Sequence, residues 1–275
     1  MKVIMLAAGI GHRLHGEDND YLPKALLGFG GKTLLARHME ILRSHGIDEM
    51  FVVVGHRKDD LLAEVASVIE AGVAPEGFVQ PLFNPRYRES GLLSLGTADA
   101  AMRSGEDVLF MDADVLYHPE LMRRLIGSKH RNCFTMDRNF EFGDEPVKVY
   151  LRGGEIFDFG KQMADGYEVI GEWPGFLRMA PEIAAKVADA VQTHIENDDL
   201  HITYEEAMRD VLVSEPAGTF GYEDITGIPW TEIDFPDDVI RAEEVILPLM
   251  KQFVADAPGN GEQAGGAPSR PGAGL

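Results

Sequence analysis

Short, continuous apolar runs alternate with stretches of helical periodicity through the first half of the chain. A strand that is apolar on both faces is typical of a parallel sheet covered by helices on both sides, because each face then packs against a helix. The pattern therefore predicts a doubly wound, mainly parallel α/β sheet. We expect strands at residues 3–6, 50–54, 78–83 and 108–111, and helices at 33–45, 59–71 and 92–102.

The pattern changes after about residue 137. Two short strands joined by Gly153-Gly154 predict a β-hairpin, and the elements after it alternate less regularly. We expect one domain over residues 1–256, divided into a doubly wound half at 1–137 and a smaller mixed half at 138–256. In the second half, strands are expected at 147–151, 155–159, 169–179, 219–222 and 230–234, and helices at 181–196, 203–212 and 236–255.

The composition indicates which binding partners and which cellular compartment to expect. The chain has 46 acidic and 25 basic residues and a net charge of −21, so we expect it to bind neither nucleic acid nor anionic membranes. A single cysteine, Cys133, excludes an internal disulfide and a cysteine-rich zinc site. With no signal peptide evident, we expect a cytoplasmic protein, and a homodimer is compatible with the sequence. Residues 257–275, with six glycines and three prolines, predict a disordered tail.

A glycine-rich segment, Leu-Ala-Ala-Gly-Ile-Gly-His-Arg-Leu at residues 6–14, directly follows the first expected strand. Such a turn lets backbone N–H groups approach phosphate oxygens closely. Arg13 can hold phosphates through paired N–H groups, and Lys24, just after Pro23, supplies a second and more compact charge. Taken alone, the glycines are equally compatible with a plain tight turn, but the two cations favour a phosphate site.

Two common nucleotide motifs do not fit this chain. The dinucleotide-binding fingerprint needs a third glycine where Leu14 stands. Gly31-Lys32-Thr33 has Leu26 where a P-loop needs its first glycine. Phosphate binding is therefore expected at the first turn and not at these rival motifs.

Asp112 and Asp114 follow the apolar strand at 108–111. Ligands of open α/β sheets bind beyond the carboxyl ends of the strands. Carboxylates two residues apart can point to the same side and offer oxygen ligands to Mg²⁺. A solvated turn is the alternative for both residues, and it is the stronger alternative for Asp112.

The glycine-rich segment, with the Pro-Lys-x-Leu-Leu that follows at residues 23–27, resembles the signature of the nucleoside triphosphate transferases that make nucleotide-activated sugars, polyols and phospho-alcohols. Asn-Pro-Arg-Tyr at 84–87, Val-Lys-Val at 147–149 and Trp-Thr-Glu-Ile-Asp at 230–234 are similar to the phosphocholine and phosphonate cytidylyltransferase-like branch. The resemblance covers about residues 2–255. It implies a Rossmann-like, GT-A-like nucleotidyltransferase fold, in which the first half binds the nucleotide and the second half the acceptor.

This resemblance also implies a reaction. A Mg²⁺-dependent enzyme would transfer CMP from CTP to a small phosphonate or phospho-alcohol and release pyrophosphate. Lys24 would contact the α-phosphate, Arg13 the β- and γ-phosphates, and Asp114 with Asp234 the metal. The acceptor's phosphate is largely ionised near neutral pH, so no catalytic base is required. The other expected nucleotide-binding residues are Leu6, Ala8, Gly9, Ile10, Gly11, Asp112 and Gln80, the last as a reader of the base.

Candidate acceptor-binding residues lie in the second half of the chain. Lys148 and Lys161 are expected to contact phosphate, although a lysine on or beside a strand is commonly a solvated edge residue. Trp173 and Tyr150 could stack on a quaternary ammonium, and Glu172 could pair with an amine, although strand aromatics more often belong to the core. Ser-Gly-Leu-Leu at 90–93 departs from an asparagine-bearing stretch of some choline-phosphate enzymes, which weakens phosphocholine as the acceptor.

Three alternatives stay open at this point. The enzyme could be a sugar- or polyol-phosphate nucleotidyltransferase that uses another nucleoside triphosphate. It could be a nucleotide-sugar glycosyltransferase, which also uses an Asp-x-Asp pair but does not need Arg13 and Lys24 at the first turn. A non-catalytic nucleotide sensor is the third alternative, and the pairing of Asp114 with Asp234 argues against it.

Overall fold

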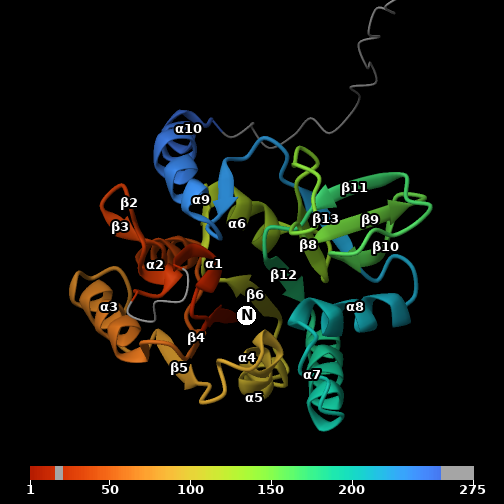
Figure 1. Cartoon of the computed structure of the whole chain (residues 1–275), viewed down its shortest axis with the longest axis horizontal. Coiled ribbons are helices and arrows are strands. Elements are labelled where there is room, and N and C mark those ends of the chain that lie inside the picture. Colours follow the sequence, from red (N-terminus) through yellow and green to blue (C-terminus); the bar gives the residue numbers. More distant parts are fainter. Residues whose placement is uncertain (16–20, 255–275) are drawn as a thin grey trace, which may run out of the picture.

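The computed structural model describes residues 1–15 and 21–254, so the expected tail at 257–275 lies outside the described residues. A seven-stranded sheet crosses the molecule in the order β13-β8-β12-β6-β1-β4-β5 (Figure 1). Its strands are β1 (Lys2–Ala7), β4 (Met50–Val54), β5 (Val79–Phe83), β6 (Val108–Asp112), β8 (Cys133–Met136), β12 (Phe176–Met179) and β13 (Gly221–Asp224).

The pairing within this sheet is mixed and mainly parallel. β1 runs parallel to β4 and β6, and β4 runs parallel to β5. β12 runs antiparallel to both β6 and β8, whereas β13 is parallel to β8. The predicted fold class is therefore confirmed. The helices that connect the parallel strands are α2 (Leu34–Ser44), α3 (Lys58–Glu70), α4 (Gly91–Thr97) and α5 (Asp99–Met102).

β1 shows why its sequence is apolar at every position. Val3 and Met5 pack into the core on one face of the sheet, with side chains of α2 and α3. Ile4, between them, packs into the core on the opposite face. All three side chains are fully buried. Successive side chains of a strand point to opposite faces of the sheet. A sheet with helices on both faces therefore requires apolar residues at consecutive positions of the strand.

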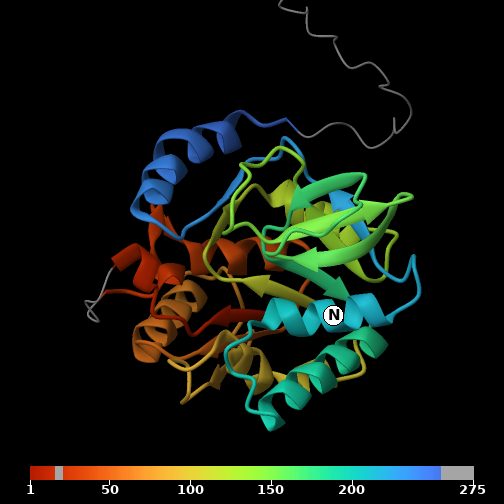
Figure 2. The ribbon, with the colours of Figure 1, turned by 45° about the vertical axis from the view of Figure 1, so that its right-hand side comes forward.

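The second half of the chain adds a smaller antiparallel sheet of β10 (Glu155–Gly160), β9 (Lys148–Arg152) and β11 (Val169–Glu172). The predicted hairpin is confirmed, with Gly153 and Gly154 both at positive φ in its turn. In Figures 1 and 2 this sheet lies on the opposite side of the molecule from α3. Two further helices, α7 (Pro181–Glu196) and α8 (Tyr204–Ser214), pack against each other. Both also contribute to the core on the face of the large sheet that contains Ile4.

Three predicted elements are divided in the structure. The helix expected at 92–102 breaks at Ala98, where ψ is 12° and the last turn of α4 closes. The closing helix expected at 236–255 consists of α9 (Pro236–Arg241), a π-helical turn (Ala242–Ile246) and α10 (Leu247–Gln252). Pro248 lacks the N–H that a regular helix would donate at this point. In the sequence, the helical spacing of apolar residues continues across the breaks in both helices, so the spacing alone did not predict them.

The strand expected at 169–179 is also wrong as one element. β11 joins the small sheet and β12 joins the large one. Gly175, between them, has a φ of +87°, a conformation that other residues rarely adopt. Several short elements were not predicted at all: α1 (His12–His15), β2 (Gly28–Phe29), β3 (Lys32–Thr33), β7 (Val115–Tyr117), α6 (Pro119–Gly127) and β8.

Within the described residues, no helix combines the length and the apolar composition needed to cross a bilayer.

Gly175→Ala is expected to destabilise the protein and disturb Asp112. An added Cβ would lie 2.5 Å from the Asp112 Oδ2, and alanine is also strained at this φ. We expect a loss of about 2–4 kcal/mol in the free energy of unfolding, measured by denaturant titration. Gly105→Ala is the matched control, because Gly105 has a φ of +79° but an added Cβ there meets nothing within 4 Å. An equal loss in both variants would contradict the steric role of Gly175.

Candidate active site

A short antiparallel ladder brings together two acidic segments that are far apart in the sequence. β7 pairs with β14 (Trp230–Glu232), so that Val115 lies opposite Glu232. The Ile233 N–H then donates to the Asp114 carbonyl oxygen at 2.9 Å. Beyond this point the Asp234 N–H donates to Asp238 Oδ2 at 2.9 Å, which fixes the start of α9. The ladder therefore places Asp114 and Asp234 side by side.

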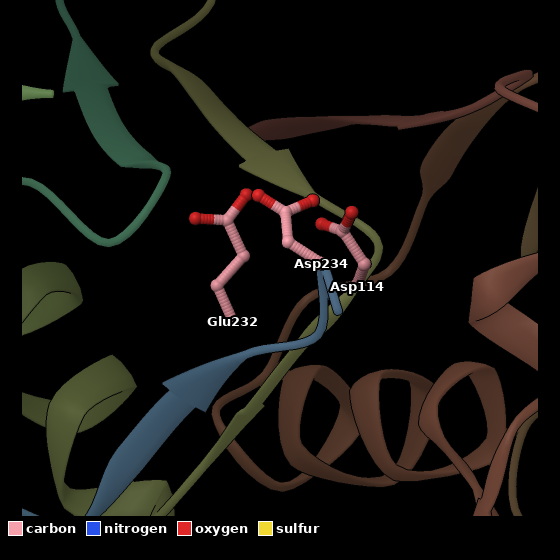
Figure 3. A group of neighbouring side chains, drawn as sticks. All are labelled: Asp114, Glu232 and Asp234. Carbon is pink, nitrogen blue, oxygen red and sulfur yellow. The ribbon is translucent and has the colours of Figure 1, made fainter. Parts of the chain in front are cut away.

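Three carboxyl groups converge at the end of this ladder (Figure 3). Asp114, Glu232 and Asp234 offer oxygen atoms that all lie within 4.8 Å of one another. Such a set of oxygens suits a hard divalent cation such as Mg²⁺. Glu232 was not among the predicted site residues, although its spacing of two from Asp234 along an extended segment is a signal for a shared face.

Two cations already balance these carboxylates. Lys24 Nζ lies 2.9 Å from Asp114 Oδ2 and 2.5 Å from Asp234 Oδ1. Arg13 reaches the same Asp234 oxygen at 3.0 Å. Burial disfavours the charge on Lys24, but Asp114 and Asp234 outweigh that effect and raise the pKa of Lys24 above its ordinary value. Lys24 is therefore a fixed positive charge at this point.

The pKa of Glu232 is also raised, which for a carboxyl group favours the neutral form. Burial, and then the charges of Asp114 and Asp234, raise the pKa of Glu232 well above its usual range, against the influence of Lys24 and Arg13. A divalent cation would favour the ionised form of all three carboxyl groups. It would also compete with Lys24 for them, which would leave the ammonium group available to a phosphate.

The glycine-rich turn lies beside this charged group. β1 ends at Ala7, and Gly11 has a φ of +75° just before α1. A Cβ added at Gly9 would meet nothing within 4 Å, so the backbone there is open to a ligand. Lys24 begins a single 3-10 turn (Lys24–Leu26) after Pro23.

A cavity of about 360 Å³ joins these parts. It brings together the glycine turn, both cations, the carboxylates at the end of β6 and residues of the second half. Predicted site residues that line it are Leu6, Ala8, Gly9, Gly11, Arg13, Lys24, Asp112, Asp114, Lys161, Trp173 and Asp234. Those that do not line it are Ile10, Gln80, Lys148 and Glu172.

Hydrogen bonds account for two of these exceptions. Gln80 donates through Nε2 to the Gly77 carbonyl oxygen at 2.9 Å. Lys148 is 1% exposed, and its Nζ donates to the carbonyl oxygens of Pro146 and Lys161, each at 2.9 Å. Lys148 therefore ties together the segments before and after the β9–β10 hairpin, and burial lowers its pKa.

The aromatic candidates lie largely in the core. Trp173 is 4% exposed and donates through Nε1 to the Phe176 carbonyl oxygen at 2.8 Å. Its ring packs parallel to that of Phe110, with centroids 6.0 Å apart. Tyr150 is fully buried, and its hydroxyl donates to the Gln162 carbonyl oxygen. Trp173 also lines the cavity, so a ligand could contact it there, but most of its side chain is enclosed by the core.

Glu172 lines a neighbouring cavity of about 600 Å³. Glu145, Glu232 and Asp234 line both cavities. Burial, followed by the nearby charge of Asp137, raises the pKa of Glu172 to about 7. Glu172 thus lines a cavity that shares the side chains of Glu232 and Asp234 with the cavity of the glycine turn.

Further cavity residues were not predicted from the sequence. Tyr204, at the start of α8, donates its hydroxyl hydrogen to Asp112 Oδ1 at 2.8 Å. Burial, and then the charges of Asp114 and Glu205, raise the pKa of Asp112 well above its usual range. Glu145 lies 2.6 Å from Arg13 and 3.5 Å from Lys161. No motif marked Tyr204, Glu205 or Glu145, because the packing of α8 and of the loop that holds Glu145 brings them to the cavity.

Residues 3–158 match the family model of the MobA-like NTP transferase domain. The chain belongs to this family. The family resemblance predicted from the sequence is thereby confirmed. Membership favours nucleotidyl transfer over the glycosyltransferase alternative.

Relatives and solved structures agree with this assignment. The chain is 31% identical over 250 residues to a "Bifunctional IPC transferase and DIPP synthase" of Rubrobacter xylanophilus, covering 88% of this chain and 51% of the relative. It is 26% identical to the "CMP-5'-(3-aminopropyl)phosphonate synthase" of Streptomyces rubellomurinus, covering 92% of this chain and 40% of the relative. The chain thus spans about half or less of these relatives' lengths.

A solved structure shows the same fold. The inositol-1-phosphate CTP transferase from T. maritima superimposes with a TM-score of 0.69 at 19% identity, covering 91% of this chain and 95% of that chain.

Proposed function

We propose that this protein is a Mg²⁺-dependent cytidylyltransferase that transfers CMP from CTP to a small phosphonate or phospho-alcohol and releases pyrophosphate. The observation that carries the proposal is the position of Lys24, which bridges Asp114 and Asp234 within the cavity that the glycine turn lines. Residues 1–137 would then bind the nucleotide, and residues 138–256 would complete the acceptor side.

The chemistry requires alignment more than proton transfer. An oxygen of the acceptor's phosphate or phosphonate attacks the α-phosphorus of CTP, and the bond between that phosphorus and the bridging oxygen to the β-phosphate breaks. The attacking group is largely ionised at neutral pH, with a second pKa of about 6 for a phosphate monoester, so no base is needed. The protein must hold two mutually repelling anions together and stabilise the charge of the transferring and leaving groups.

Each cation has a distinct task in this proposal. Lys24 contacts the α-phosphoryl group, and Arg13 contacts the β- and γ-phosphates of the leaving pyrophosphate. The backbone N–H groups from Gly9 to Gly11 face the triphosphate. Asp114, Glu232 and Asp234 would hold Mg²⁺, which when bound supplies charge stabilisation to the phosphoryl oxygens.

The choice of CTP and of the acceptor class is supported by the relatives. One relative is named as an IPC transferase and another as the synthase of a CMP-linked phosphonate, and the similar solved structure is an inositol-1-phosphate CTP transferase. A sugar- or polyol-phosphate acceptor with another nucleoside triphosphate is the competing form of the same reaction.

Pyrophosphate release tests the proposal directly. The four common nucleoside triphosphates would be crossed with a panel of phosphocholine, aminoethyl-, hydroxyethyl- and hydroxymethylphosphonate, and glycerol, inositol and hexose phosphates, with Mg²⁺ or with a chelator. We expect acceptor-dependent pyrophosphate with CTP, and none with the chelator. Release with only a hexose phosphate and UTP or dTTP would keep the reaction type and refute the proposed substrates. No release with any pair would refute nucleotidyl transfer.

Lys24→Ala should lower kcat by at least about 100-fold, equivalent to ~2.7 kcal/mol of transition-state stabilisation, because a fixed charge at the α-phosphoryl group is lost. The variant should still fold, because Arg13 still pairs with Asp234. Lys32→Ala is the control, since Lys32 pairs with exposed Glu40 on the surface. Unchanged turnover in Lys24→Ala, or loss of folding, would count against the role assigned to Lys24.

A further inference from the structure

A buried histidine contacts the backbone next to the metal-site carboxylates. His38, in α2, is 1% exposed, and its Nε2 lies 3.1 Å from the carbonyl oxygen of Ala113. Ala113 is itself buried and stands between Asp112 and Asp114. His38 lines neither of the two cavities. It therefore reaches the site only through the backbone that carries Asp114.

The hydrogen-bond partners determine which nitrogen of His38 carries the proton. A carbonyl oxygen can only accept, so Nε2 is the donor to Ala113. The other ring nitrogen, Nδ1, lies 3.4 Å from the Tyr117 hydroxyl, which donates to it when the ring is neutral. Burial lowers the pKa of His38 to about 4, so the ring is neutral near pH 7. The histidine thus donates on one side and accepts on the other.

Asp114 is held by hydrogen bonds to the peptide groups on both sides of its Cα. The Ala113 carbonyl belongs to the preceding peptide group and accepts from His38. The Asp114 carbonyl belongs to the following peptide group and accepts from the Ile233 N–H at 2.9 Å. Because φ and ψ are the rotations of these two rigid groups about Cα, holding both groups also fixes the direction of the Asp114 Cβ. His38 and Ile233 together therefore set the position of the Asp114 carboxylate.

The helix that carries His38 is also linked to the turn of Lys24. Leu34, the first residue of α2, donates its N–H to the Leu27 carbonyl oxygen at 3.0 Å. Leu27 is the residue at which the 3-10 turn of Lys24 ends. Helix α2 is thus joined by hydrogen bonds to the segments that carry Lys24 and Asp114, which are two partners of the central ion pair.

We propose that His38 is a positioning residue for the metal site: its Nε2–H holds the Ala113 carbonyl so that the Asp114 carboxylate is aimed at a bound divalent cation. This inference rests on the proposed function, whose metal site contains Asp114. A buried carbonyl oxygen that loses its donor is costly, so removal of the histidine donor would favour rotation of this peptide group. Partners one step outside a metal's own ligands typically change metal affinity by about 10- to 100-fold.

A purely structural role is the alternative for His38, because its ring also packs in the core. The ring stacks on that of Tyr117, with centroids 5.5 Å apart. A structural role predicts that every substitution of His38 weakens metal binding only as far as it disturbs packing. A positioning role predicts that metal binding depends on whether the new side chain can donate to the Ala113 carbonyl oxygen.

His38→Gln and His38→Asn separate the two roles. The amide nitrogen of glutamine is as many bonds from Cα as Nε2 of histidine, whereas that of asparagine matches Nδ1 and stops short of Ala113. The Mn²⁺ affinity of the protein, without nucleotide or acceptor, would be measured by electron paramagnetic resonance, together with denaturant unfolding. We expect a Kd for Mn²⁺ within about 3-fold of the wild-type value in His38→Gln and raised by about 10-fold in His38→Asn.

Leu42→Ala is the stability control, because Leu42 is an apolar and fully buried residue of the same helix. It should destabilise the protein and leave the Kd for Mn²⁺ unchanged. Wild-type affinity in His38→Asn would overturn the inference. Equal weakening in His38→Gln and His38→Asn, or in Leu42→Ala, would also overturn it, because lost packing would then be the cause.

The tautomer of His38 provides a second test, which stands even if His38→Asn fails to fold. Nitrogen-15 NMR of the wild-type side chain at neutral pH should show a proton on Nε2 and none on Nδ1. A proton on Nδ1 with none on Nε2 would overturn the inference, because the ring would then have no hydrogen to donate to Ala113.

The failure of this inference is distinguishable from the failure of the proposed function. Unchanged Mn²⁺ binding in His38→Asn, with acceptor-dependent pyrophosphate release by the wild type, would overturn the role of His38 and leave nucleotidyl transfer standing. The expected Mn²⁺ affinities, with no pyrophosphate release from any pair of substrates, would overturn the proposed function and leave the role of His38 standing. A wild type that binds no Mn²⁺ would overturn the inference.

Discussion

The pairing of Lys24 with Asp114 and Asp234 is the interaction on which the rest of the site depends. Each partner comes from a different part of the fold: the 3-10 turn at Lys24–Leu26, the link between β6 and β7, and the segment after β14. Three carboxyl groups this close would repel one another strongly without a cation. Lys24 and Arg13 balance them in this structure, and a bound divalent cation with a triphosphate would redistribute the same charges during catalysis.

The same arrangement explains how a chain with a net charge of −21 can accept anionic substrates. The overall surface repels phosphate, but Arg13, Lys24 and Lys161 all line one cavity. Glu145 pairs with both Arg13 and Lys161 and so links these two cations. Charge gathered at a single site produces local attraction that the net charge does not reveal.

Much of the fold and part of the site were predictable because they depend on local patterns. Apolar runs predicted the parallel strands, and the spacing of Gly9, Gly11, Arg13 and Lys24 predicted a phosphate-binding turn, which the structure places around one cavity. Other features depend on how distant segments close over a side chain. Lys148 looks like an exposed strand lysine until the Pro146 and Lys161 carbonyl groups enclose its Nζ. Likewise, Glu205 is one of two adjacent glutamates, and only the packing of α8 determines which one lines the cavity.

The central claim is that this cavity transfers the α-phosphoryl group with its attached nucleoside, and the fate of labelled CTP tests it most directly. With radioactive phosphorus at the α-position, we predict that all label consumed appears in an acceptor-linked CMP product. With the label at the γ-position, we predict that it appears only in pyrophosphate. Gamma label in the acceptor, or α-label released as free CMP or CDP, would contradict the account.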